Sequence, residues 1–286
     1  MKSRILFFIL LITFSFLFFS CATTSNTISF DYTSQDKYEI GTEVAANILG
    51  TYKIYHNENL YIYLNSICNT IGINADKVNP YKGYSVGVLD TNVINAFATP
   101  GGHILISRGM LKSANSEDEL AAIIAHEIGH IQLEHSIKAI KKNTRTQKIG
   151  NFATTTYTYI KILQGDKSAQ EINLIKKSGD FITNISTELI NLGYSKTSEY
   201  NADKMAIYLL EKTGYNPNSM ITMLENLKKN KSKNYLLAFG KTHPRPNQRI
   251  KKANKVIKKM YKNTTQENEY NEDSRIYRFE NIKLYF

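Results

Sequence analysis

The stretch "AIIAHEIGHIQLEH", residues 122–135, constrains the fold of this chain more than any other feature. Its isoleucines recur at helical spacing and predict a buried stripe, yet three histidines and two glutamates share the segment. Burying such side chains costs free energy unless something binds them. Positions four apart share one face of a helix, so His126 and His130 can present imidazole nitrogens to one metal ion. We therefore expect a metal-binding helix within the core.

Glu127 strengthens this prediction because it lies beside the histidines, offset by one residue. Its carboxylate can reach a metal-bound water without being a ligand, as in the H-E-x-x-H signature of zinc peptidases. Gly129 predicts close approach by another backbone, since a glycine inside a helix otherwise costs about 1 kcal/mol. The alternative is a buried histidine pair satisfied by hydrogen bonds. We expect His135 to fall off the ligand face and to lie on the surface.

A catalytic zinc needs a third protein ligand, and "SEYNAD" offers one. Glu199 and Asp203 are four apart on a predicted helix. Glu199 can complete the metal triad, while Asp203, one turn on, can hold a ligand histidine by its second nitrogen. An acidic pair at this spacing is by itself typical of a solvated helix face, but the histidine pair favours the ligand interpretation.

Four segments together carry a family resemblance: "NAFATPGGHILISRGML", "HEIGH", "EYNAD" and "THPRPNQRI". In order and character they resemble the gluzincin metallopeptidase family that contains HtpX, Oma-type proteases and the CaaX prenyl endopeptidase. The resemblance covers roughly residues 37–260, and it is strongest to the soluble, exported lipoprotein branch. It implies an α+β, zincin-like fold, mostly helical with a small β-sheet beside the HExxH helix, and a Zn²⁺ ion as cofactor.

The resemblance also implies roles for individual residues. His126, His130 and Glu199 would bind zinc, Glu127 would act as general base and acid, and Asp203 would support a ligand from behind. His243 is implied to approach the site and stabilise the oxyanion, while Arg249 is implied to be structural. The family's substrate-binding edge strand falls on Asn95, Ala96, Phe97, Ala98 and Thr99.

The N-terminus predicts export. Lys2 and Arg4 precede an apolar run over residues 5–19, which is typical of a secretory signal peptide over residues 1–20. An uncleaved membrane anchor is the alternative, because the run approaches the length of a membrane span. Cys21 at the end of the run resembles a bacterial lipobox, so we expect its lipidation and attachment to the membrane on the periplasmic side of the cell envelope. Residues 21–36, which are polar, then suit a flexible tether.

Charge and cysteine content limit the possible partners. The formal net charge is +11, and much of it lies in lysine runs such as "KKANKVIKK". Such a run is typical of a solvated helix face, although it can also favour an anionic membrane surface. Export argues against nucleic acid as a partner. Cys68 is the only cysteine besides Cys21, so we expect it to be a buried small side chain without a disulfide.

Local patterns predict the elements of a peptidase domain over residues 37–262 and a C-terminal tail over residues 263–286. Asn57 and Gly72 bound one helix, and Ser116 with Glu119 forms a capping box that starts a long helix reaching about Lys138. Residues 263–286 could add an edge strand or stay flexible. The other expected elements are helices over 36–55, within 143–194, from Ser195 or Thr197 to Gly214, 217–229 and 246–262, and strands over 84–89, 95–99 and 103–107.

These features together favour a zinc metalloendopeptidase that cleaves unfolded or misassembled envelope proteins. An extended polypeptide substrate would pair with the predicted edge strand. The alternative from another class is a chaperone or assembly factor that keeps the fold but whose protease site is gated or little used.

Overall fold

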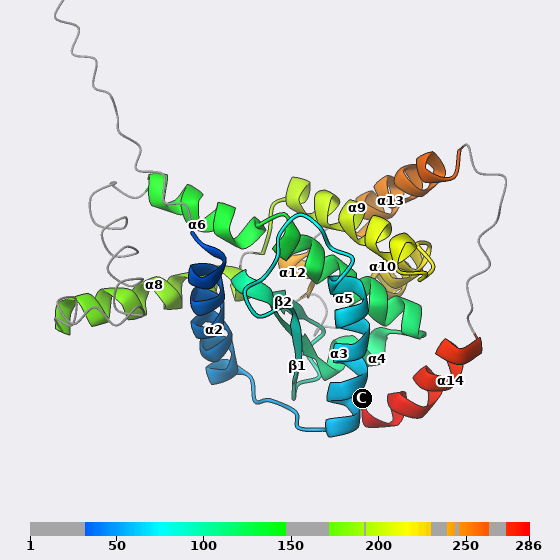
Figure 1. Cartoon of the computed structure of the whole chain (residues 1–286), viewed down its shortest axis with the longest axis horizontal. Coiled ribbons are helices and arrows are strands. Elements are labelled where there is room, and N and C mark those ends of the chain that lie inside the picture. Colours follow the sequence, from blue (N-terminus) through cyan, green and yellow to red (C-terminus); the bar gives the residue numbers. More distant parts are fainter. Residues whose placement is uncertain (1–31, 147–171, 192, 230–238, 244–245, 263–272) are drawn as a thin grey trace, which may run out of the picture. The chain divides into compact units, whose positions relative to one another are not determined.

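Three short strands form a sheet with β3 in its centre, and this sheet lies beside the HExxH helix (Figure 1). β1 (Ser85–Leu89) pairs with β3 (His103–Ser107) in parallel, and β2 (Ala96–Ala98) pairs with β3 in antiparallel fashion. All three predicted strands are confirmed to within two residues. β2 is an edge strand of this sheet, because β3 is its one strand neighbour among the described residues.

The computed structural model describes residues 32–146, 172–191, 193–229, 239–243, 246–262 and 273–286. Its helices are α2 (Ser34–Thr51), α3 (Glu58–Gly72), α4 (Arg108–Ser113), α5 (Glu117–Gln132), α6 (His135–Thr146), α8 (Ile172–Asn191), α9 (Lys196–Lys212), α10 (Ser219–Lys229), α12 (Phe239–Thr242), α13 (Pro246–Met260) and α14 (Asp273–Ile282). Single-turn 3₁₀ helices occupy Pro100–Gly102 and Lys283–Tyr285. The architecture is the expected α+β, zincin-like one.

α5, the HExxH helix, is buried along its whole length. Ser116 caps it as predicted, because its hydroxyl accepts a hydrogen bond from the Glu119 backbone. The carboxylate of Glu119 accepts from the Asn115 backbone instead of closing the capping box onto Ser116. Arg278 of α14 donates to the buried carboxylate of Glu117, so the C-terminal helix holds the first turn of α5.

α9 packs directly against α5, and Gly129 makes this contact possible. A Cβ atom on Gly129 would lie 2.9 Å from the Ala202 carbonyl oxygen, closer than real Cβ atoms come. The predicted close approach of another backbone is therefore confirmed. Ser195 caps α9, and Gly214 follows its end with φ of +76°. The buried side of α9 contains Ala202, Ala206, Leu209 and Leu210.

The predicted extension of the HExxH helix to Lys138 is wrong. α5 ends at Gln132, Glu134 takes a φ of +52°, and α6 begins at His135. The Gln132 side chain explains the interruption in part: its amide oxygen accepts hydrogen bonds from the backbones of Lys77 and Val78, which fixes a distant loop at the helix end. No local pattern announces that contact.

Two further expectations need correction. The first helix begins at Ser34, inside the expected tether. It ends at Thr51 and not at Tyr55, because the Tyr55 backbone donates a hydrogen bond to Val88 of β1. In the tail, residues 273–282 form α14, neither an edge strand nor a flexible segment, since Phe279 and Ile282 pack into the core at helical spacing.

Several expectations lie outside the described residues. They are the signal peptide, the lipidation site Cys21, most of the tether, and residues 147–171. Among the described helices, none is both long and apolar enough to cross a membrane. Cys68 is fully buried as predicted, and burial raises the pKa of its thiol to about 12.

Candidate metal and active site

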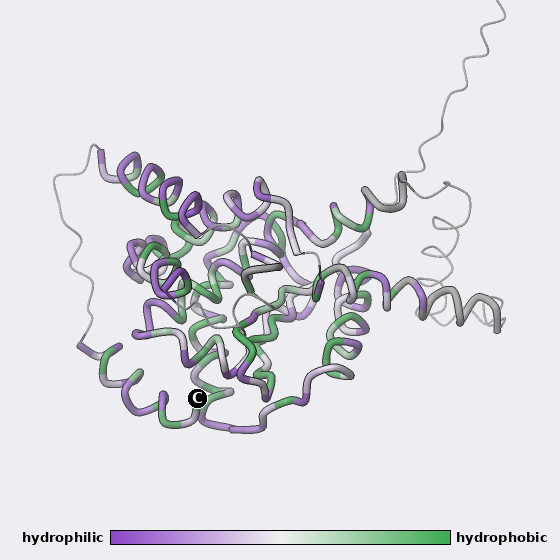
Figure 2. Tube along the Cα trace, turned by 180° about the vertical axis from the view of Figure 1, so that it is seen from behind, coloured by the Kyte–Doolittle hydropathy of each residue, from purple (hydrophilic) through white to green (hydrophobic). Residues whose placement is uncertain are grey.

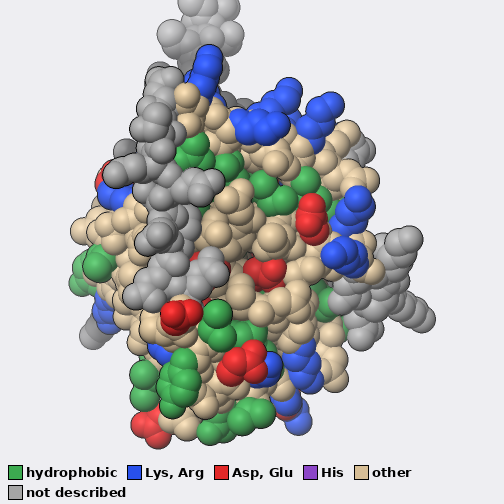
Figure 3. All heavy atoms as spheres, turned by 90° about the vertical axis from the view of Figure 1, so that its right-hand side faces the viewer, with side chains coloured by type: hydrophobic (Ala, Val, Ile, Leu, Met, Phe, Trp, Pro, Cys, Tyr) green, Lys and Arg blue, Asp and Glu red, His purple; other side chains and the backbone are tan. Residues whose placement is uncertain are grey.

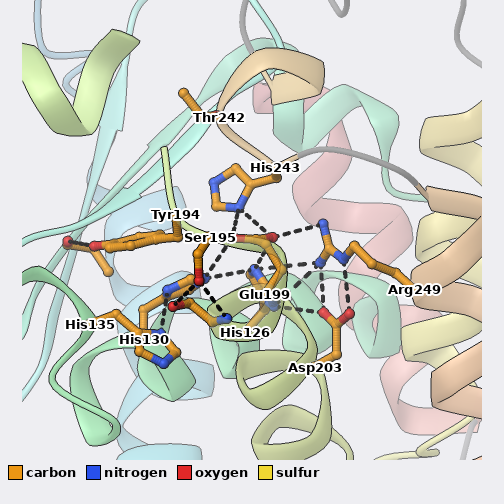
Figure 4. Close-up of polar contacts among 12 residues, drawn as sticks. His126, His130, His135, Tyr194, Ser195, Glu199, Asp203, Thr242, His243 and Arg249 are labelled. Atoms are coloured by element: carbon orange, nitrogen blue, oxygen red, sulfur yellow. Dashed lines mark hydrogen bonds and ion pairs between the residues drawn. The ribbon is translucent and has the colours of Figure 1, made fainter. Parts of the chain in front are cut away.

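Four side chains from three parts of the chain converge beside α5: His126, His130, Glu199 and His243 (Figure 4). α5 supplies the first two, α9 supplies Glu199, and His243 directly follows α12. One possible ligand atom from each lies within 4.8 Å of the other three. All four side chains are buried, with exposed fractions of 3% or less. The structure therefore brings together the three predicted ligands, and His243 lies beside them, where the family resemblance implied it.

The distances fit a metal ion at the point of convergence. His126 Nε2 and His130 Nε2 lie 3.1 Å apart, so two ring nitrogens face each other. The Glu199 carboxylate oxygens lie 3.6 Å from His126 Nε2 and 3.4 Å from His130 Nε2. His243 Nδ1 lies 3.0 Å from the same carboxylate. Imidazole nitrogens and one carboxylate are the donor set of catalytic zinc sites.

Glu127 provides the second test of whether a metal fits. Both of its carboxylate oxygens are buried, and neither has a hydrogen-bond partner within the described part of the chain. An isolated buried carboxylate is costly, so natural sites supply it with a partner. A water bound to a metal beside His126 and His130 would be such a partner, which fits the expected role of Glu127.

Asp203 holds His126 from behind, as the sequence predicts. Its Oδ1 lies 3.0 Å from His126 Nδ1, and Arg249 donates to both of its oxygens at 2.9 and 2.7 Å. Burial alone would raise the pKa of Asp203, but the Arg249 guanidinium outweighs burial and lowers it. Asp203 is therefore a carboxylate that can accept the Nδ1 proton of His126 and leave Nε2 free for a metal.

The prediction that His135 lies on the surface is wrong, because its side chain is buried in the site. Its Nδ1 lies 2.9 Å from Nδ1 of His130. Burial lowers the pKa of His135 to about 3, with a further contribution from His130, so the ring is neutral. A neutral imidazole can accept the Nδ1 proton of His130, as Asp203 does for His126. The break after α5 brings His135 back to this position.

Arg249 and His243 supply the positive charge around Glu199. Arg249 is fully buried, and its Nη1 lies 3.2 Å from Glu199 Oε2. Burial opposes ionisation of Glu199, but His243 and Arg249 hold its pKa well below the usual range. Burial also opposes protonation of His243, yet the Glu199 carboxylate outweighs it and raises the pKa of His243.

The expected substrate strand borders the site, but its outer edge is covered. The Tyr194 hydroxyl donates to the Ala98 carbonyl of β2 at 3.3 Å, and the Tyr194 ring stacks on His130 with centroids 4.1 Å apart. At the other end, the Phe239 backbone donates to the Ile94 carbonyl. The sequence offered no signal for Tyr194, which precedes the cap of α9. Asn95, Ala96, Phe97, Ala98 and Thr99 are all buried.

Comparison with known proteins agrees with this geometry. Residues 63–257 match peptidase family M48. The chain is 26% identical over 207 residues to the beta-barrel assembly-enhancing protease of Yersinia pestis, a match that covers 69% of this chain and 39% of that protein. It is 27% identical over 234 residues to the mitochondrial metalloendopeptidase OMA1 of Schizosaccharomyces pombe, covering 79% and 61% respectively.

The metalloprotease LoiP of Escherichia coli is a third relative, 28% identical over 168 residues, with 58% of each chain covered. The chain thus matches between 39% and 61% of the length of these three proteins. The resemblance that the four sequence segments carry is confirmed at the level of the family.

Proposed function

Because the chain belongs to peptidase family M48, we propose that it is a zinc-dependent metalloendopeptidase. One observation carries the proposal: the two unpartnered, buried oxygens of Glu127 lie in a site where His126, His130 and Glu199 converge. A structural histidine cluster does not require an unsatisfied carboxylate at this position. A hydrolase does require one, because a free carboxylate must take a proton from the attacking water.

The roles of the side chains follow from their contacts. His126, His130 and Glu199 would hold zinc, which when bound polarises a water and a peptide carbonyl. Glu127 would accept a proton from the attacking water at its free carboxylate and deliver it to the leaving amine. Asp203 and His135 would fix the ring orientations of His126 and His130 through their Nδ1 atoms. Arg249 would balance the charge of Glu199 and Asp203.

The substrate class that we propose is an extended, unfolded or misassembled polypeptide of the cell envelope. Edge strand β2 supports this, because an extended chain can add to a sheet edge through main-chain hydrogen bonds once the Tyr194 hydroxyl leaves the Ala98 carbonyl. The names of the Y. pestis and E. coli relatives, a beta-barrel assembly-enhancing protease and a metalloprotease, accord with such a role. The predicted signal peptide and the position of Cys21 support attachment to the envelope membrane through an N-terminal lipid.

The proposal is tested with purified protein, by metal analysis and by cleavage of casein. We expect about one zinc per chain, and loss of cleavage on treatment with a chelator. Glu127→Gln should keep its metal while cleavage falls at least about 100-fold, since general acid–base catalysis contributes about 10²–10⁴. Glu225→Gln, an exposed glutamate on α10, is the matched control and should leave both unchanged. Undiminished cleavage by Glu127→Gln would refute the mechanism.

A second candidate function is a chaperone or assembly factor with a gated protease site, and two contacts favour it. Tyr194 covers the carbonyl of Ala98 on the expected substrate strand. His243 lies beside the three proposed metal ligands, at the position that a zinc-bound water would need. The His243→Ala variant separates the two candidates. If His243 closes the site, this variant cleaves casein faster than the native chain. If His243 stabilises the oxyanion, cleavage falls at least about tenfold while the metal stays bound.

A further inference from the structure

α13 has two faces, and only one of them serves the site. Its buried side contains Arg249, Ala253 and Ile257, and it packs against α9 and α10. At about 100° per residue, its five lysines between positions 251 and 259 fall within an arc of about 120° on the opposite side. They extend along about 12 Å of the helix. All five are exposed: Lys251, Lys252, Lys255, Lys258 and Lys259.

This lysine face is unusually free of negative charge. α13 contains no acidic residue, and none of its five lysines forms an ion pair within the ranges that the structure describes. Figure 2 shows the outer part of this helix as hydrophilic, and Figure 3 shows basic side chains gathered at the top of the face that α13 borders. Five like charges on one arc repel one another, so binding an anionic partner would lower this repulsion.

α9 extends the lysine face sideways. Lys252 lies over the Tyr200 ring, with Nζ 3.6 Å from the ring centroid. Lys204 and Tyr208 follow Tyr200 at successive helical turns, and Tyr208 is 45% exposed. Lysines interspersed with partly exposed tyrosines are typical of surfaces that lie at a membrane interface, where the ring sits among headgroups.

We propose that the lysine face of α13, together with Lys204 and Tyr208 of α9, docks onto an anionic phospholipid surface. This is an attachment separate from any N-terminal lipid, and it does not depend on the proposed peptidase activity. The five lysines lie on the convex outside of a helix, and they line none of the three cavities found beside Pro100, Tyr63 and Ser116. A convex, evenly charged stripe suits an extended plane of headgroups better than it suits a single small anion.

Two other polyanions fit the face less well. Single-stranded nucleic acid binds by stacking bases on open aromatic rings, but lysine ammonium groups lie over both Tyr200 and Tyr208. An acidic polypeptide in extended form would need a sheet edge or a groove to pair with, and α13 offers a helix face. Both are nevertheless included as alternatives in the test.

The test uses the full chain and vesicles of phosphatidylcholine alone or with 30% phosphatidylglycerol. The measured quantity is the ratio of partitioning onto anionic over neutral vesicles, in which any contribution of the N-terminal segment cancels. The test variant changes Lys251, Lys255, Lys258 and Lys259 to Gln. The matched control changes four exposed lysines elsewhere, Lys53, Lys77, Lys82 and Lys112, to Gln, so both variants lose the same net charge.

Each lysine near an anionic surface contributes about fivefold to partitioning. We expect the ratio to fall at least tenfold in the test variant and less than about threefold in the control, with equal thermal unfolding midpoints. Raising the salt to about 0.5 M should abolish the native preference. Equal losses in the two variants, or a native ratio near one, would overturn the proposal.

If the N-terminal segment binds all of the protein to both vesicle types, the partition ratio cannot show a preference, and lysine acetylation is measured instead. Lysines of the α13 face should then be protected on anionic vesicles but not on neutral ones, while Lys53 and Lys77 react equally on both. Absence of that selective protection would overturn the proposal. So would tighter binding of the native chain to a single-stranded oligonucleotide or to polyglutamate at the same salt, lost in the test variant.

Discussion

Nδ1 of His135 lies 2.9 Å from Nδ1 of His130, across the break that separates α5 from α6. The contact gives His130 the same kind of support that Asp203 gives His126 at 3.0 Å. Each proposed ligand histidine thus has a partner on the nitrogen that faces away from the point of convergence. One partner is an anion held by Arg249 and the other is a neutral ring.

The first prediction concerns this neutral ring. His135→Ala removes the acceptor for the His130 Nδ1 proton, so zinc affinity should fall about 10–100-fold, the usual effect of losing such a partner. His135→Gln, whose amide oxygen can accept the proton, should recover part of the loss. Zinc titration against a competing chelator measures the effect, and the exposed His56→Ala serves as control. Native affinity in His135→Ala would show that the contact does not orient His130.

The second prediction separates Glu199 from Asp203. Glu199→Gln removes a proposed ligand charge, so zinc affinity and casein cleavage should both collapse. Asp203→Asn removes only the acceptor behind His126, so the loss should be about 10–100-fold and extra zinc should recover part of it. Metal titration of both variants decides between these roles. Equal losses that resist added zinc would mean that Asp203 is itself a ligand.

The third prediction concerns the contact between α5 and α9. Gly129→Ala would place a methyl group 2.9 Å from the Ala202 carbonyl, so the helices must separate. We expect the free energy of unfolding to fall by about 1–3 kcal/mol, despite the better helix propensity of alanine. Gly50→Ala in α2 is the control, because its added carbon meets nothing within 4 Å. That change should be neutral or stabilising by up to about 1 kcal/mol in urea unfolding.

The fourth prediction concerns the buried Arg249. Arg249→Met removes the positive charge between Glu199 and Asp203, and it leaves two buried carboxylates close together. Breaking a buried ion pair from one side costs about 3–5 kcal/mol, so the metal-free chain should be destabilised by about that amount in urea unfolding. Zinc should restore part of the stability, because a cation would then face Glu199. Lys251→Gln, on the outer face of the same helix, should change unfolding by less than about 0.5 kcal/mol.

Local sequence alone predicted the parts of this protein that depend on neighbours three or four residues away. The HExxH spacing placed His126, Glu127 and His130 on one turn of a helix, and caps at Asn57, Ser116 and Ser195 set where three helices begin. Short runs of β-branched residues around the turn signal Pro100-Gly101-Gly102 located the three strands. Such features follow from helix and strand periodicity, which a short segment carries by itself. The need of a zinc site for a third ligand, with the spacing of Glu199 and Asp203, placed Glu199 beside the histidines, and the family resemblance implied the same role.

Tertiary structure decided what depends on contacts between distant segments. No pattern in residues 115–119 predicts that Arg278 of the tail binds Glu117. Likewise, no pattern near His135 predicts that Gln132 binds the loop at Lys77. That contact accompanies the end of α5, which turns His135 from an expected surface residue into a buried partner of His130. Burial and ion pairing depend on which elements meet in space, and that choice reflects the packing of the whole core rather than the preference of any one segment.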